Sequence, residues 1–164
     1  MLPRAETGSW YAARASDPLT GGTFVAQSMS LDRLLADIDA AKARAPHAPI
    51  LLAGFSQGAC LSLELLSRER PIVAACAAFT GCCVGVAGDV RPAADLQGFP
   101  VLLTGSDADP WISIKAWSEA AADLSSQGAR LRREVYPERT HEVCDSVIGL
   151  LQGVLKRLIA VIPP

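Results

Sequence analysis

Residues 49–58 read PILLAGFSQG, and this stretch decides the fold. Pro49–Phe55 is a short apolar run, the pattern of a strand that is buried on both faces of a sheet. A helical pattern follows over Gln57–Arg70, so Ser56 lies on a tight turn between a strand and a helix. Glycines two residues on either side let the neighbouring backbone approach closely. This G-x-S-x-G spacing is typical of a serine nucleophile held on a strained strand-to-helix turn.

Further apolar runs and amphipathic stretches follow along the chain. Strands that alternate with helices predict an α/β fold, with a mainly parallel sheet of about four strands flanked by helices. The first 23 residues read as irregular, and Ser30 is the predicted N-cap of the first helix. Gly128 is the predicted C-cap of the third helix. The remaining predicted elements are strands at 72–79, 101–104 and 131–136 (an edge strand) and helices at 31–44, 112–127 and 142–160.

The composition indicates a globular chain without a nucleic-acid partner. Its 164 residues predict a single domain over 1–164, and half of them are hydrophobic. The formal net charge is −2, and no tract of clustered lysine or arginine is available to bind phosphates. The small basic cluster at Arg130, Arg132 and Arg133 is interrupted by Leu131 and reads as a solvated strand face.

The cysteines and the apolar segments indicate the cellular compartment of the protein. Five cysteines without a CxxC pair argue against a disulfide framework and against a zinc site, so we interpret them as small buried thiols in a reducing compartment. Residues 1–10 hold no apolar run, so no signal peptide is expected and the predicted location is the cytoplasm. Residues 71–88 carry no charge and approach the length of a membrane span. Their Ala, Gly and Cys content favours a buried strand followed by a loop instead of stable membrane insertion.

Ligands bind parallel sheets at the carboxyl ends of the strands. Besides Ser56 after the first strand, this singles out the segments after the third and fourth strands. After the third strand, Asp107 and Asp109 compete for a chemical role, and either one could belong to a polar loop that caps the next helix. After the fourth strand, His141 opens the last helix, where a neutral imidazole could take the serine proton. Along the chain these candidates occur in the order Ser, Asp, His, which is the order found in α/β folds that carry the nucleophile on such a strand-to-helix turn. His47 precedes the first strand at the opposite edge and reads as a surface residue.

Four segments together resemble the phospholipase/carboxylesterase family of α/β-hydrolases, which includes the acyl-protein thioesterases. They are SWYAAR (9–14), GFSQGA (54–59), GSDADPWI (105–112) and YPERTHEV (136–143). In that family the catalytic aspartate directly precedes a proline, which points to Asp109, and the histidine follows a YPG-like turn, which points to His141. The resemblance therefore implies a Ser56–Asp109–His141 triad, a carboxylic ester or thioester as substrate, and no cofactor or metal.

The same resemblance implies further roles and one deficit. The backbone N–H of Gln57 would donate to the oxyanion, and Phe55 and Trp111 are candidates for lining the acyl pocket, although such aromatic residues are more often core. Family members begin with further strands and an HG-type glycine loop that supplies a second oxyanion donor, and nothing in this sequence resembles them. We therefore expect a shortened fold with an open apolar edge beside the first strand, and either weak stability or homo-oligomerisation through that edge.

Three hypotheses for function follow. The first is a serine esterase or thioesterase that uses the triad. The second is a non-catalytic fragment or interaction module, in which a partner buries the open edge. The third is a relative of the cysteine-nucleophile dienelactone hydrolases, which is weaker because the turn carries Ser56 while Cys60 lies a turn into the helix.

Overall fold

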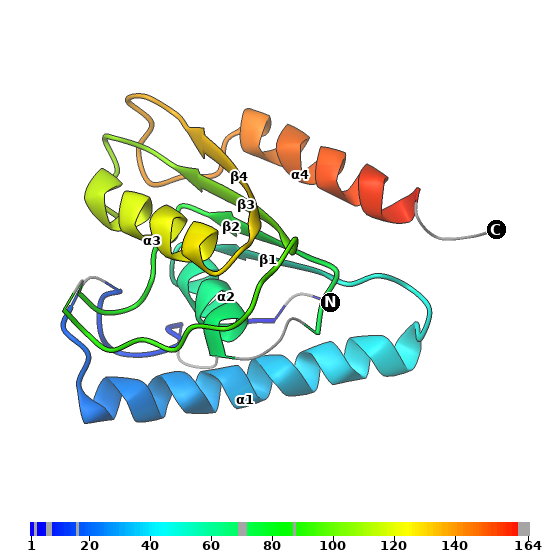
Figure 1. Cartoon of the computed structure of the whole chain (residues 1–164), viewed down its shortest axis with the longest axis horizontal. Helices are drawn as coiled ribbons and strands as arrows, with labels where there is room; N and C mark the ends of the chain where they lie inside the picture. The colour runs from blue at the N-terminus through cyan, green and yellow to red at the C-terminus, as the bar shows by residue number, and fades with distance from the viewer. Residues whose placement is uncertain (2, 6–7, 16, 69–71, 87, 161–164) are drawn as a thin grey trace.

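The computed structural model describes the chain except for residues 2, 6–7, 16, 69–71, 87 and 161–164. The described part contains four strands and four helices (Figure 1). In chain order they are α1 (Gly21–Arg44), β1 (Leu51–Phe55), α2 (Gln57–Arg68), β2 (Ala75–Phe79), β3 (Pro100–Gly105), α3 (Ile114–Ser126), β4 (Arg130–Val135) and α4 (Asp145–Ile159).

The four strands form one sheet in the order β1-β2-β3-β4, and each neighbouring pair is parallel. The register places Leu52 opposite Cys76, and Cys76 opposite Val101. All four carboxyl ends therefore lie along one edge of the sheet. The predicted α/β fold with a four-stranded parallel sheet and flanking helices is confirmed.

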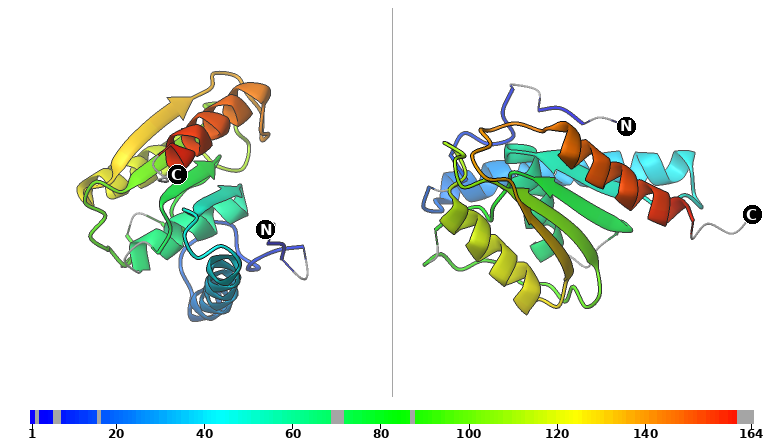
Figure 2. Two further views of the ribbon diagram at one scale, coloured as in Figure 1. Left: turned by 90° about the vertical axis from the view of Figure 1, so that its right-hand side faces the viewer. Right: turned by 90° about the horizontal axis from the view of Figure 1, so that it is seen from above.

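Helices cover both faces of this sheet (Figure 2). Leu63 of α2 and Ala120 of α3 belong to one buried cluster with Cys76 of β2, so these two helices share a face. Val147 of α4 packs with Ala77 on the other face, because successive side chains of a strand point to opposite sides. The long helix α1 packs against α2 and against β1, the strand at the end of the sheet, because Leu34 of α1 shares a buried cluster with Leu61 and Leu52.

The first helix begins ten residues earlier than predicted. Thr20 is its N-cap and its hydroxyl accepts a hydrogen bond from the N–H of Thr23, whereas Ser30 lies within the helix. Phe24 and Met29 in the first turns of α1 are exposed and do not pack on the core. The sequence therefore shows no regularly spaced buried apolar residues that would indicate a helix there. The Gly21-Gly22 pair also reads as a turn, although glycine is tolerated in the first turn of a capped helix.

The last helix begins later than predicted, and His141 does not open it. Cys144 is the N-cap and has an extended backbone, and its carbonyl accepts the first helical hydrogen bond from the N–H of Ile148, so the helix begins at Asp145. His141 therefore lies in the loop between β4 and α4. The predicted strands and α3 agree with the structure to within three residues, and Gly128 directly follows the C-cap of α3 with a φ of 84°. For α2, predicted residues 69–70 lie outside the described residues.

The first strand is not buried on both faces, which corrects the sequence prediction. Ala53 and Phe55 are exposed, because β1 is the last strand of the described sheet and pairs only with β2. The strand that is buried along its whole length is β2. The expected open apolar edge is therefore present beside Ser56.

The five cysteines are free thiols. Cys60, Cys76 and Cys82 are buried, whereas Cys83 and Cys144 are partly buried. Burial raises the pKa of the Cys76 thiol to about 12. In the part of the chain that is described, no group of three His, Cys, Asp or Glu residues could hold a metal ion. None of its helices combines the length and the apolar character needed to cross a bilayer.

Candidate active site

The candidate site lies at the carboxyl edge of the sheet. Ser56 directly follows β1, Asp109 lies in the loop after β3, and His141 lies in the loop after β4. These three residues are far apart in the sequence. The parallel strands bring them together because every strand ends at the same edge.

Ser56 occupies a strained turn. Its φ is +54°, in the left-handed region that is unusual for a residue with a side chain. Its N–H donates to the carbonyl oxygen of Phe79, and its own carbonyl accepts from the N–H of Cys60 in the first turn of α2. The sheet and the helix thus hold this backbone conformation from both sides, and the hydroxyl projects above the sheet edge.

The two glycines of the motif differ in what they contribute. A Cβ on Gly54 would lie 2.3 Å from the carbonyl oxygen of Gly58, so a side chain there would collide with backbone. A Cβ on Gly58 would meet only the indole nitrogen of Trp10, at 3.8 Å, which is an ordinary contact. The expectation that both glycines are needed for close approach therefore holds for Gly54 alone.

A chain of two hydrogen bonds joins the three predicted residues. Nε2 of His141 lies 2.7 Å from Oγ of Ser56, and Nδ1 of His141 lies 2.7 Å from Oδ2 of Asp109. An ionised carboxylate can only accept, so the imidazole donates from Nδ1 and its Nε2 is left to accept the serine proton. This is the tautomer that a general base needs.

Asp109 is held in its ionised form. Its side chain is fully buried, and burial by itself opposes ionisation. Against this, Oδ1 accepts from the N–H groups of Ile112 (2.9 Å) and Trp111 (2.8 Å), and Oδ2 receives the His141 ring. These hydrogen bonds outweigh desolvation and lower the pKa of Asp109 below its ordinary value.

The two aspartates that compete in the sequence have different positions in the structure. Asp107 does not bond to the histidine ring; its Oδ1 accepts from the N–H of Glu138 at 2.8 Å. The hydroxyl of the neighbouring Ser106 donates to the carbonyl oxygen of Arg139. Residues 106–107 therefore fix the loop that carries His141, while Asp109 contacts the imidazole itself.

Arg139 is a buried residue that the sequence did not single out. Its side chain donates from Nη2 to Oγ1 of Thr80 at 2.9 Å, and its guanidinium lies 4.8 Å from the centre of the Tyr136 ring. Thr80 directly follows β2, so Arg139 ties the histidine loop to the middle of the sheet edge. No local pattern reveals such a contact, because the two residues lie 59 positions apart.

Gln57 contributes through its side chain as well as its position. It is the first residue of α2, so its backbone N–H is one of those that a helix leaves without an intrahelical partner. Its side-chain Oε1 accepts from the N–H of Trp10, and its Nε2 donates to the carbonyl of Tyr11, both at 2.7 Å. The segment around SWYAAR is thereby fixed to the turn that holds Ser56.

A cavity of about 240 Å³ opens beside Ser56 and His141. Trp111 lines it and is 60% exposed, with its ring 6.5 Å from the ring of His141. Phe55 packs against His141 with ring centres 4.9 Å apart, but it is not among the residues that line this cavity. The remaining lining residues are Ala13, Arg14, Ala15, Gln57, Cys60 and Ile112.

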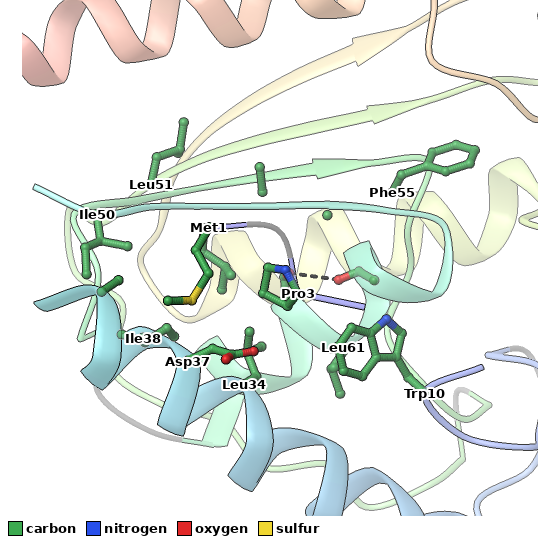
Figure 3. A pocket seen from close by; sticks show the side chains of 16 residues that line it. Met1, Pro3, Trp10, Leu34, Asp37, Ile38, Ile50, Leu51, Phe55 and Leu61 are labelled. Atoms are coloured by element: carbon green, nitrogen blue, oxygen red, sulfur yellow. Dashed lines mark hydrogen bonds between the residues drawn. The ribbon is translucent and has the colours of Figure 1, made fainter. Parts of the chain in front are cut away.

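A second hollow of about 420 Å³ runs along the open side of β1, and Phe55 borders it (Figure 3). Its walls are mainly apolar side chains of β1, α1 and α2. His47 is exposed before β1, as expected, and is not among the residues that line either hollow. Arg130, Arg132 and Arg133 are exposed on β4, which confirms the prediction of a solvated face.

The sequence matches the phospholipase/carboxylesterase family over residues 7–159. The chain belongs to this family. Membership supports a hydrolase with esterase or phospholipase activity, and the resemblance seen in the four sequence segments is confirmed. No curated protein matches the sequence significantly.

Solved structures of this family are similar to the chain. A phospholipase/carboxylesterase from Dyadobacter fermentans is 27% identical with a TM-score of 0.82, over 94% of this chain and 74% of that one. SOBER1 from Arabidopsis thaliana is 18% identical with a TM-score of 0.76, over 92% of this chain and 74% of that one. A carboxylesterase from Mesorhizobium loti is 21% identical with a TM-score of 0.72, over 94% and 71%. The last two support the fold alone.

Proposed function

We propose that this phospholipase/carboxylesterase family member is a serine esterase or thioesterase that forms an acyl-enzyme on Ser56. The observation that carries the proposal is the pair of 2.7 Å hydrogen bonds that joins Ser56, His141 and Asp109 in series. Its substrate is a small molecule with a carboxylic ester or thioester bond. Because all five cysteines are free thiols, we also propose a reducing compartment, the cytoplasm.

The proposed reaction begins when Oγ of Ser56 attacks the acyl carbon while Nε2 of His141 takes the hydroxyl proton. Asp109 keeps the imidazole in the required tautomer and stabilises the imidazolium that forms. When the tetrahedral intermediate collapses, Nε2 protonates the leaving alcohol or thiol, and the acyl group stays on Ser56. Water then attacks the acyl-enzyme with His141 again as the base, which releases the acid and restores Ser56. Every proton transfer in this scheme runs between the substrate, water and the side chains of Ser56 and His141.

The backbone N–H of Gln57 is the proposed donor to the oxyanion. It stands at the N-terminus of α2, where the helix dipole also favours negative charge. Removal of one oxyanion donor from a hydrolase costs about 10²–10³-fold in turnover. With Gln57 as the single assigned donor, we expect slow but measurable hydrolysis.

The direct test is labelling with a fluorophosphonate, which reacts only with a serine that its histidine activates. Oγ of Ser56 displaces fluoride and forms a bond to phosphorus, so the intact mass rises and peptide mapping locates the adduct. We expect an adduct on Ser56 that is absent from the His141→Ala protein. If circular dichroism shows a folded chain and no adduct forms, the proposed function is wrong. Parallel assays with an ester and its thioester analogue then separate the two substrate classes.

The open edge of β1 favours a second role, in self-association. Ala53 and Phe55 are exposed on this strand, and the apolar hollow of about 420 Å³ lies beside it (Figure 3). An unpaired strand edge next to apolar surface is a template for another strand. We propose that a second copy of the chain covers this edge.

We expect light scattering after size exclusion to give the mass of a dimer for the wild type and of a monomer for Ala53→Lys. The lysine places a charge on the edge strand, which opposes pairing. Ala122→Lys is the matched control, because Ala122 is an exposed residue of α3 remote from β1. A monomeric wild type with a sharp, high-temperature unfolding transition would contradict the proposed association.

A further inference from the structure

The cavity beside Ser56 has a single arginine among its lining residues. Apart from His141, the residues that line it are uncharged except for Arg14. Its volume of about 240 Å³ lies below the roughly 300–1,000 Å³ of pockets that enclose drug-sized ligands. A substrate that exceeds this volume therefore extends from Ser56 toward the mouth of the cavity, where the exposed residues Arg14 and Trp111 lie.

The guanidinium of Arg14 lies over the Trp111 ring, and no carboxylate of the described residues is paired with it. It lies 5.5 Å from the centre of the Trp111 ring, which in turn stands edge-on to His141. The nearby Asp17 accepts a hydrogen bond from the backbone N–H of Arg14 and not from its side chain. Among the described residues, no acidic side chain forms an ion pair with Arg14. Its positive charge is therefore available to a ligand.

The segment that carries Arg14 is fixed to the catalytic turn. Gln57, the residue after the nucleophile, bonds to Trp10 and Tyr11 through its side chain. Tyr11 and Ala15 are both buried in the core, so the backbone of Arg14 between them is anchored next to the cavity. The fold therefore holds the backbone of Arg14 close to the turn that carries Ser56.

We propose that the substrates of this site are small esters that carry a carboxylate or phosphate group near the scissile bond, and that Arg14 binds this anion at the cavity mouth. The inference rests on the proposed function and specifies its substrate class. A guanidinium suits such a group because its N–H fork matches the two oxygens of the anion. The cation–π contact with Trp111 favours one orientation of the side chain before the substrate arrives.

The test compares esters that differ only in charge. One pair changes the acid side: the para-nitrophenyl monoester of glutaric acid against the same ester of its neutral monoamide. The other pair changes the alcohol side: the acetate of meta-hydroxybenzoate against the acetate of meta-hydroxybenzamide. Spontaneous hydrolysis of each ester is subtracted, and kcat/KM is measured for the wild type, Arg14→Gln, Arg14→Lys and Arg133→Gln. Arg133 is an exposed arginine of β4, so its variant controls for the loss of one charge.

We expect the wild type to prefer the anionic member of at least one pair by about fivefold, the upper range for an exposed ion pair. The pair that shows the preference identifies the side of the ester that carries the anion. Arg14→Gln should bring the ratio to about one, Arg14→Lys should restore part of it, and Arg133→Gln should leave the wild-type ratio. Raising the ionic strength to about 1 M, where the Debye length is about 3 Å, should lower the ratio as well.

Three results would overturn the inference, and they show whether the proposed function falls with it. Hydrolysis of the neutral esters that depends on Ser56 but shows no charge preference, or a preference that survives Arg14→Gln, refutes the anion site and leaves the proposed function standing. The absence of hydrolysis of all four esters, together with no fluorophosphonate adduct, refutes both.

Discussion

Replacing Asp109 with Asn is expected to lower kcat for ester hydrolysis by about 10⁴-fold. The amide keeps the shape of the carboxylate, and its oxygen can still accept from the N–H groups of Trp111 and Ile112. Its NH₂ group then faces Nδ1 of His141 and must donate to it. The imidazole is forced into the other tautomer, so Nε2 carries a proton and can no longer accept the proton of Ser56. Steady-state hydrolysis of a para-nitrophenyl ester measures the loss.

Asp107→Asn is the matched control for this substitution. Asp107 also lies in the loop after β3, but it bonds to the N–H of Glu138 and not to the imidazole. An asparagine oxygen can accept that hydrogen bond, so we expect kcat to fall by less than about tenfold, the cost of perturbing one loop contact. Equal losses for the two variants would mean that loop geometry, and not the histidine tautomer, accounts for the effect of Asp109→Asn.

Much of the fold could be predicted because buried strands and amphipathic helices leave regular patterns in this sequence. Residues 75–79 are apolar without interruption, and in the structure β2 is buried along its whole length. The start of α1 could not be predicted from such patterns. Phe24 and Met29 face solvent there, and the cap depends on the hydroxyl of Thr20 in a segment that otherwise reads as a turn.

The part of the candidate site that could be predicted consists of the residues that directly follow the strands. Ser56 follows β1 and His141 follows β4, so a parallel sheet places both at one edge whatever the details of packing. Contacts between distant side chains could not be foreseen. The hydrogen bonds of Gln57 to the SWYAAR segment span more than 40 positions, and the bond from Arg139 to Thr80 spans 59. No local spacing distinguishes these residues from exposed polar ones.

The two glycines of the G-x-S-x-G motif are expected to differ in their effect on stability, because backbone atoms lie close to Gly54 but not to Gly58. We expect Gly54→Ala to lower the free energy of unfolding by at least about 3 kcal/mol, as severe overpacking does. The new Cβ would lie 2.3 Å from the carbonyl oxygen of Gly58 and 2.7 Å from the backbone nitrogen of Ala59. These are backbone atoms of α2, so the whole first turn must move, which also displaces Ser56. Thermal unfolding measures the loss, roughly 10 °C in Tm for a chain of this size.

Gly58→Ala is the control that separates close approach from the motif as a pattern. Gly58 lies in the first turn of α2, and its new Cβ would meet nothing closer than the Trp10 indole nitrogen at 3.8 Å. Alanine is favoured over glycine in helices by up to about 1 kcal/mol, so this variant should unfold at the same temperature or slightly higher. If both substitutions destabilise the chain equally, the space beside Gly58 is needed for the sheet edge, and the geometric distinction between the two glycines is wrong. If only Gly54→Ala does so, the strained turn depends on one close contact between β1 and α2.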